Sequence, residues 1–127
     1  MYTISNMNYS IKEAAKETTL SEYTLRYYEK IGLISNVQRS DNGHRIYNKK
    51  NIDWIIFITR LKATGMSLKH IIQYAQMQQT GASTREQRMK LLKNHREKIN
   101  SDIEFLKENR NVLDRKIAFY KDLEKKK

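Results

Sequence analysis

The stretch after Gly81 contains neither glycine nor proline, so no helix breaker interrupts it up to the end of the 127-residue chain. Ser83 to Glu86 have the order of a capping box, which predicts the start of a helix. Apolar residues then recur at alternating spacings of three and four for about five heptads, and they are Met89, Leu92, Ile99, Ile103, Leu106, Leu113, Ile117 and Tyr120. A helix of about 40 residues is ~60 Å long and cannot bury this stripe against so small a chain. We therefore predict a partner helix and a homodimer.

Two arginines, Arg96 and Arg110, interrupt this stripe. A charge at a seam position lowers stability but can fix the register of the pairing. A second apolar row widens the face beyond a two-stranded seam and consists of Leu91, Phe105, Val112 and Phe119. This width predicts packing on globular parts of the dimer as well. The periodicity leaves the relative direction of the two helices open.

Two short helices are predicted near the other end of the chain. Ser10 and Glu13 have the spacing of a capping box, and the helix they open has room to reach about Lys16 or Glu17. Ser21 supplies a new cap for a second helix, Glu22 to about Lys30. Helices joined by so short a connection must cross sharply, as in a helix-turn-helix.

The second helix has one apolar and one polar face. Leu25 and Tyr28 share the first face, whereas Tyr23, Arg26 and Tyr27 lie on the second. An arginine can donate two hydrogen bonds to a guanine edge or bind a phosphate, and a tyrosine offers a hydroxyl on a stiff side chain. By itself the pattern favours an ordinary amphipathic surface helix, and the following segment reverses this preference.

A basic hairpin follows this helix. Gly32 stands where a left-handed helix end is expected, and residues 34–37 and 45–47 flank Asp41-Asn42-Gly43, whose Asn-Gly pair is a strong hairpin signal. The tip of this predicted wing carries Arg39, His44 and Arg45. The order of helix, helix and wing predicts a winged helix-turn-helix that binds double-stranded DNA.

A third helix is predicted over residues 48–64, with Asn48 as its cap and Gly65 as its stop. Its apolar segment 54–58 would also suit a buried strand, but the length and the end signals favour a helix. Ser67 then caps a fourth helix, which ends at Gly81 and is expected to bury Leu68, Ile71, Ile72 and Ala75. The amides near Ser67 and the Lys69 ammonium suit a phosphate, although a plain cap is an equal alternative.

Charge and composition narrow the classes of function. The net charge of +11 suits a partner rich in phosphate, although a solvated helix tolerates it too. The chain has no cysteine, which excludes disulfides, thiolate metal sites and thiol redox switches. Its three histidines are far apart in the sequence, and no phosphate loop or paired-carboxylate motif occurs. We therefore expect no enzyme, no catalytic residues, no metal and no cofactor.

Targeting signals are also missing from the sequence. The first eight residues lack a basic cluster followed by an apolar run, and no segment approaches the ~18 apolar residues of a spanning helix. The expected location is the cytoplasm, without a membrane partner.

Four motifs carry a resemblance to a known family. They are Tyr9-Ser10-Ile11, Thr24-Leu25-Arg26-Tyr27-Tyr28-Glu29, Ile31-Gly32-Leu33-Ile34 and Asn42-Gly43-His44-Arg45-Ile46-Tyr47, and Gly65-Met66-Ser67-Leu68 continues the match. Together they resemble the N-terminal domain of MerR-type transcription regulators. His44 departs from the pattern, since many members have another aromatic or apolar residue there.

The resemblance implies a mainly α fold with a winged helix-turn-helix domain over residues 1–80 and a coiled-coil dimerisation helix over residues 81–127. Antiparallel pairing of that helix is implied as well. The residues expected to contact DNA are Tyr23, Arg26, Tyr27, Arg39, His44, Arg45, Tyr47, Ser67 and Lys69. Such dimers act on a pseudo-palindromic promoter by bending and untwisting the DNA, with RNA polymerase as the further partner.

Two other functions compete with this hypothesis. One is an architectural or recombination-accessory DNA-binding protein that senses no effector, and the other is a coiled-coil adaptor whose basic face meets a membrane or an acidic protein. The effector is open as well. Either a small molecule binds between the terminal helix and the DNA-binding domain, near Tyr74, Phe119 and Tyr120, or no small effector exists.

Overall fold

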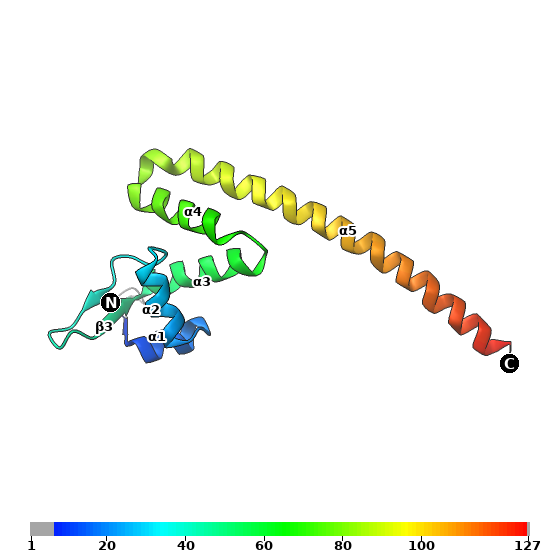
Figure 1. Ribbon diagram of the computed structural model, residues 1–127, viewed down its shortest axis with the longest axis horizontal. Helices are drawn as coiled ribbons and strands as arrows, with labels where there is room; N and C mark the ends of the chain where they lie inside the picture. The colour runs from blue at the N-terminus through cyan, green and yellow to red at the C-terminus, as the bar shows by residue number, and fades with distance from the viewer. Residues whose placement is uncertain (1–6, 127) are drawn as a thin grey trace, which may run out of the picture. The chain divides into compact units, whose positions relative to one another are not determined.

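The structure, a computed structural model, describes residues 7–126, so most of the opening segment examined for a targeting signal lies outside it. The elements in chain order are β1 (Asn8–Tyr9), α1 (Ile11–Thr18), α2 (Glu22–Lys30), β2 (Gln38–Arg39), β3 (Arg45–Asn48), α3 (Lys49–Ala63), α4 (Leu68–Thr80), the 3-10 turn η2 (Ala82–Thr84) and α5 (Arg85–Lys125). They form two compact units, Met1–Arg88 and Met89–Lys127. The prediction of a mainly α fold with a small hairpin and a long final helix is confirmed (Figure 1).

Side-chain caps define the first two helices. The Ser10 hydroxyl accepts the Glu13 amide at 3.1 Å, and the Glu13 carboxylate accepts the Ser10 amide at 2.9 Å. The hydrogen bond from the Ser10 backbone amide, helped by the Ser10 hydroxyl, lowers the pKa of Glu13 below its usual value. Helix α1 ends at Thr19, which adopts a left-handed backbone with φ of 59°. The Ser21 hydroxyl accepts the Thr24 amide at 3.0 Å and opens α2 as predicted.

A Schellman turn closes α2. Gly32 has φ of +85°, its amide donates to the Glu29 carbonyl, and the Leu33 amide donates to the Tyr28 carbonyl. The chain then enters the core, because Leu33 and Ile34 are each only 2% exposed. This burial is why residues 34–37 are not the predicted wing strand: the strand begins later, at Gln38.

The three short strands form one antiparallel sheet in the order β1-β3-β2. In the wing, which we define as residues 38–48, Gln38 pairs with Ile46 and Arg39 with Arg45. The turn between the two strands is closed by the Gly43 amide on the Ser40 carbonyl at 2.8 Å, with Gly43 at φ of +82°. The hairpin predicted from Asn42-Gly43 is therefore present, and β1 adds a third strand that the sequence did not suggest.

Helices α3 and α4 pack against each other and complete the first unit (Figure 1). Ile52, Ile55 and Ile58 are buried along one face of α3, which confirms the helix over the alternative strand. The Trp54 indole N–H donates to the Leu33 carbonyl at 2.7 Å and ties α3 to the end of α2. On α4, Ile71 and Ala75 are buried as predicted, whereas Ile72 is half-buried.

Two expectations around α4 and α5 are wrong. Leu68 is 40% exposed, whereas Tyr74, which was not among the residues expected in the core, is buried. The long helix does begin within the segment from Ser83 to Glu86, but not with the predicted capping box. Residues 82–84 form a 3-10 turn, the buried Thr84 hydroxyl donates to the Met77 carbonyl at 2.6 Å, and α5 begins at Arg85.

Helix α5 is one uninterrupted helix of 41 residues, none of them buried. The side chains of the predicted seam lie on the surface of the single chain, and Leu106, for example, is 65% exposed. Leu92 and Ile99 are half-buried. The stripe therefore exists in the structure as an unsatisfied apolar face.

Candidate nucleic-acid interface

Helix α2 presents the polar face that the sequence predicted. Leu25 and Tyr28 are buried against the rest of the unit, which turns the opposite face of the helix to solvent. On that face Tyr23 is 76% exposed, and Tyr27 and Arg26 are exposed as well. The helix is thus anchored by its apolar side and offers a phenol, a guanidinium and a second phenol side by side.

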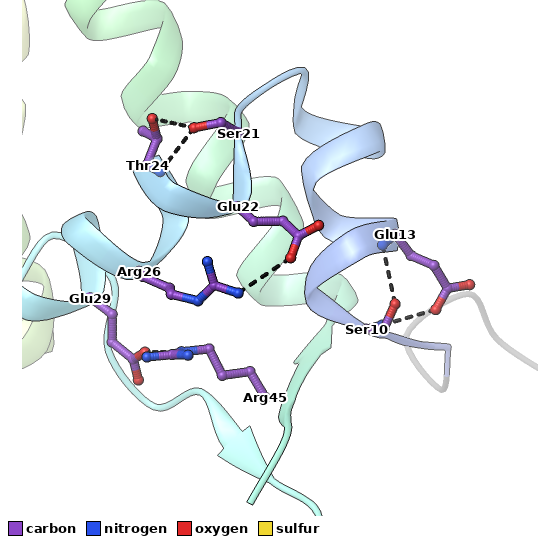
Figure 2. A network of polar contacts seen from close by, with 8 residues as sticks. All are labelled: Ser10, Glu13, Ser21, Glu22, Thr24, Arg26, Glu29 and Arg45. Atoms are coloured by element: carbon purple, nitrogen blue, oxygen red, sulfur yellow. Dashed lines mark hydrogen bonds and ion pairs between the residues drawn. The ribbon is translucent and has the colours of Figure 1, made fainter.

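Arg26 is held only loosely. Its guanidinium lies 3.3 Å from the Glu22 carboxylate one turn earlier, and both side chains are about half exposed (Figure 2). An exposed pair of this kind contributes roughly 0.2–0.5 kcal/mol. A guanine edge or a phosphate can therefore replace Glu22 as the partner of Arg26 at small cost.

Glu29 connects α2 to the wing. Its carboxylate accepts the Arg45 Nε–H at 2.5 Å (Figure 2). The same carboxylate lies 3.9 Å from the Arg39 guanidinium. The side chains of Glu29 and Arg45 are only 24% and 21% exposed, so this pair is partly desolvated. Sequence reasoning missed Glu29, because its partner is sixteen positions away and no helical spacing reports such a contact.

The predicted residues of the wing differ in their exposure and in the partners that they already bind. Arg39 is exposed, and its guanidinium donates to the Gly43 carbonyl at 3.0 Å, which fixes it beside the turn. His44 is exposed in the turn itself. Arg45 lies on β3 and is half-buried with its Nε committed to Glu29, so only the remaining guanidinium nitrogens can reach a phosphate.

Tyr47 does not lie on the surface, and its assignment to the DNA contacts is corrected. The side chain is fully buried, and among the described residues nothing bonds to its hydroxyl. Burial raises the pKa of Tyr47 above its usual value, an effect that the nearby Arg45 opposes. Alternation on β3 places Tyr47 on the core side, since Ile46 and Asn48 flank it with greater exposure.

The beginning of α4 offers the remaining predicted contacts. The Ser67 hydroxyl accepts the His70 amide at 3.2 Å, and Ser67 and Lys69 are exposed. The cap leaves the first amides of the helix and the Lys69 ammonium free to meet an anion. The structure thus agrees with both readings of this helix end, the phosphate contact and the plain cap.

Over residues 7–126, no three His, Asp or Glu side chains come together as a metal site. In the same range no helix is both long enough and apolar enough to cross a bilayer.

Family comparisons identify the chain's relatives. Residues 9–78 match the model of the MerR HTH family regulatory proteins, and residues 52–116 match the MerR DNA-binding model. An uncharacterized HTH-type transcriptional regulator from Haemophilus influenzae is 39% identical over 90% of this chain and 84% of its own length.

Solved structures agree with this result. The crystal structure of HiNmlR, a MerR family regulator lacking the sensor domain, bound to promoter DNA, has a TM-score of 0.83 and 38% identity over 91% of this chain and 92% of that chain. A MerR family transcriptional regulator from Listeria monocytogenes has a TM-score of 0.83 and 35% identity over 88% and 85%. These relatives are regulators, which confirms that the chain is not an enzyme. The protein therefore belongs to the MerR family of DNA-binding transcription regulators.

Proposed function

We propose that the protein acts as a homodimer on a pseudo-palindromic promoter, with one α2 helix in the major groove of each half-site. The observation that carries this proposal is the exposed face of α2, where Tyr23, Arg26 and Tyr27 are open to solvent while the apolar side of the helix is buried. Support also comes from HiNmlR, a relative of similar length that has been crystallised with promoter DNA.

The exposed stripe of α5 supports the homodimer. Eight apolar side chains at heptad spacing cannot remain in water without cost, and each one that a partner helix covers contributes roughly 1.5–3 kcal/mol at full burial. Arg96 is 65% exposed at a seam position and has Glu97 within 3.9 Å, so a pairing that keeps it in contact with solvent avoids the cost of burying a charge. The same chain is the simplest partner with a matching stripe.

The proposed mechanism is mechanical. Two basic domains that grip phosphates at fixed separation can bend and untwist the duplex between them, which moves two polymerase elements into phase. In each domain α2 reads the groove, while Arg39, His44 and the free nitrogens of Arg45 contact the backbone together with Ser67 and Lys69. RNA polymerase then binds the deformed promoter. Because the target is chromosomal DNA, the proposed location is the cytoplasm.

Replacing Arg26 by alanine tests the major-groove assignment. We expect Arg26→Ala to weaken binding to the selected operator by about 1–3 kcal/mol and to reduce discrimination against random duplex, because the lost base contact leaves two acceptors on guanine without their donors. Operators are selected from a random duplex library, and affinities are measured by fluorescence anisotropy at several salt concentrations.

Arg85→Ala is the matched control, since Arg85 is exposed at the start of α5 and the change removes the same charge. If both variants lose affinity equally for all sequences, α2 makes no base contact. If neither the wild type nor the control prefers any operator over random duplex, the protein is an architectural binder instead.

A further inference from the structure

A cavity lies on the first unit at the base of the wing. Its volume is about 340 Å³, and it is bounded by Asn36 of the loop that leads into β2, by the first turns of α3, and by Gln79 at the end of α4. Ligand pockets in proteins usually measure about 300–1,000 Å³, so the space suits a small metabolite. Tyr74, near which the sequence placed an effector, does not line it.

The capping box of α3 leaves the side-chain NH₂ groups of two asparagines without a bond inside the box. The side-chain Oδ1 of Asn48 accepts the backbone N–H of Asn51 at 2.8 Å, and the side-chain Oδ1 of Asn51 accepts the backbone N–H of Asn48 at 2.9 Å. Backbone donors thus fix both side-chain oxygens, and the two NH₂ groups must point away from the box. Both residues line the cavity.

Asn51 is the more informative of the two because it is only 9% exposed. Its NH₂ group has no hydrogen-bond partner among residues 7–126. In that range the Tyr47 hydroxyl alone is both sealed from solvent and without a partner, so the Asn51 NH₂ group still has access to solvent. A buried donor of this kind normally has a partner. In Asn51 the cavity is the remaining place from which a partner can come.

The other groups around the cavity have matching chemistry. Lys50 adds an ammonium, and the first amides of α3 have no partner within the helix. No carboxylate lines the cavity. The nearby Asp53 is not part of the lining and pairs with Lys49 at 3.1 Å. The Trp54 ring, which stacks on Tyr74 at 5.8 Å, forms an apolar wall and has already donated its N–H to Leu33.

We propose that this cavity binds a small anion, a metabolite that carries a carboxylate or a phosphate. The anionic group accepts hydrogen bonds from the NH₂ groups of Asn48 and Asn51 and pairs with Lys50, while the rest of the ligand lies against Trp54. A phosphate of bound DNA has the same chemistry as a free phosphate ester. The experiment below therefore tests both sources.

The position of the cavity also gives the ligand a way to act. Asn36 has a left-handed backbone with φ of 61° and belongs to the loop between α2 and the wing. An anion bound between this loop and α3 changes the relative free energies of the positions that the wing can take with respect to α2. This regulatory step rests on the proposed function, whereas binding of the anion does not.

Two isosteric variants remove the donors while keeping the caps. In Asn51→Asp and Asn48→Asp a carboxylate oxygen still accepts the backbone amide, so the start of α3 remains capped, but the NH₂ group is replaced by an acceptor that repels anions. Asn94→Asp is the control, because Asn94 is exposed on α5 and the change adds the same charge. Circular dichroism melts verify that all three variants fold.

Trp54 provides the readout, since it is the only tryptophan of the chain and lines the cavity. The full-length protein is titrated with inorganic phosphate and with succinate at constant ionic strength, and tryptophan fluorescence is recorded. We expect saturable changes in the wild type and in Asn94→Asp. Affinity should fall about tenfold or more in Asn51→Asp, as the loss of a charge-assisted hydrogen bond predicts.

The contrary results are equally specific. No saturable change in the wild type, or equal affinity in Asn51→Asp, overturns the anion site. If the anions do not bind but Asn51→Asp weakens duplex binding about tenfold more than Asn94→Asp does, the donors hold a DNA phosphate and the metabolite proposal is wrong. Anion binding that leaves operator affinity unchanged retains the site and rejects its regulatory step.

Discussion

At the scale of residues, the contact between Glu29 and Arg45 connects the two parts of the candidate interface, helix α2 and the wing. The helix that presents Arg26 and the hairpin that carries Arg39 have no backbone hydrogen bond to each other in their regular elements. The Glu29 carboxylate supplies the link from a partly buried position. A charged group there depends on its partner, because water solvates it incompletely.

Glu29→Gln should therefore destabilise the folded unit. The change leaves the Arg45 guanidinium without its carboxylate, and we expect the free energy of unfolding to fall by about 1–3 kcal/mol. Glu22→Gln is the matched control, since its pair with Arg26 is exposed and its loss should cost less than about 0.5 kcal/mol. Urea unfolding measures both variants. Equal effects would show that burial does not strengthen the Glu29 pair.

Tyr47 is the residue for which the structure and the family pattern differ most. Its hydroxyl is buried without a described partner, so Tyr47→Phe should leave the free energy of unfolding at neutral pH unchanged or raise it by up to about 1 kcal/mol. Tyr28→Phe is the contrast, because the Tyr28 hydroxyl lies 3.3 Å from the Lys62 ammonium and the variant should lose about 0.5–1.5 kcal/mol. Operator affinity should not change in Tyr47→Phe, and a marked loss would return Tyr47 to the DNA contacts.

The raised pKa of Tyr47 predicts a dependence on alkaline pH. The unfolded chain releases the phenolic proton near pH 10, whereas the native state, whose pKa is raised by burial, retains it. The native state then binds more protons, so stability is full below about pH 10 and falls as pH rises toward the native pKa. Unfolding measured from pH 8 to 11 should show an additional decline in the wild type relative to Tyr47→Phe. Parallel curves would contradict the assignment.

At the scale of elements, local chemistry made most of the fold predictable. Ser10, Ser21, Asn48 and Ser67 each accept the amide three residues later, so the caps identified in the sequence are the caps of the structure. Such contacts depend only on neighbours in the chain. The errors arose where tertiary packing decides, as at Ile34, which is buried in the core and not part of a strand, and at Thr84, whose buried hydroxyl bonds to the Met77 carbonyl in a 3-10 turn where a capping box was expected.

The candidate interface divides in the same way. The free face of α2 follows from helical periodicity, so its three residues were predicted correctly as surface groups. The link through Glu29, the burial of Tyr47 and the cavity beside Asn51 depend on which segments meet in space. The spacing of residues along the chain does not predict such contacts between distant segments.

The turn at Gly32 tests how strongly a single position controls an element. A side chain at φ of +85° is strained, but a Cβ at Gly32 would meet no atom within 4 Å, so the cost of Gly32→Ala is purely conformational. We expect a loss of about 1–2 kcal/mol in thermal unfolding. Gly32→Asn should lose less, because asparagine tolerates the left-handed region better. An unchanged stability in Gly32→Ala would mean that α2 does not end in this turn.

At the scale of the whole molecule, assembly through α5 is the central proposal. Replacing both Ile103 and Leu106 by aspartate places charges in the seam and should give monomers of 15.2 kDa in sedimentation equilibrium, with tight operator binding lost. The control carries Asn94→Asp and Ser101→Asp, two changes outside the apolar stripe. A dimeric seam variant, or a monomeric control, would show that α5 does not pair through this face.

Pairing through the exposed stripe of α5 also determines how promoter occupancy depends on the concentration of this protein in the cell. If two chains must meet before an operator is gripped, the amount of active species rises with the square of chain concentration wherever most chains are single. A twofold change in synthesis would then change promoter occupancy up to about fourfold at low expression. For a regulator with few ways to sense chemistry through its side chains, gene dosage itself becomes an input.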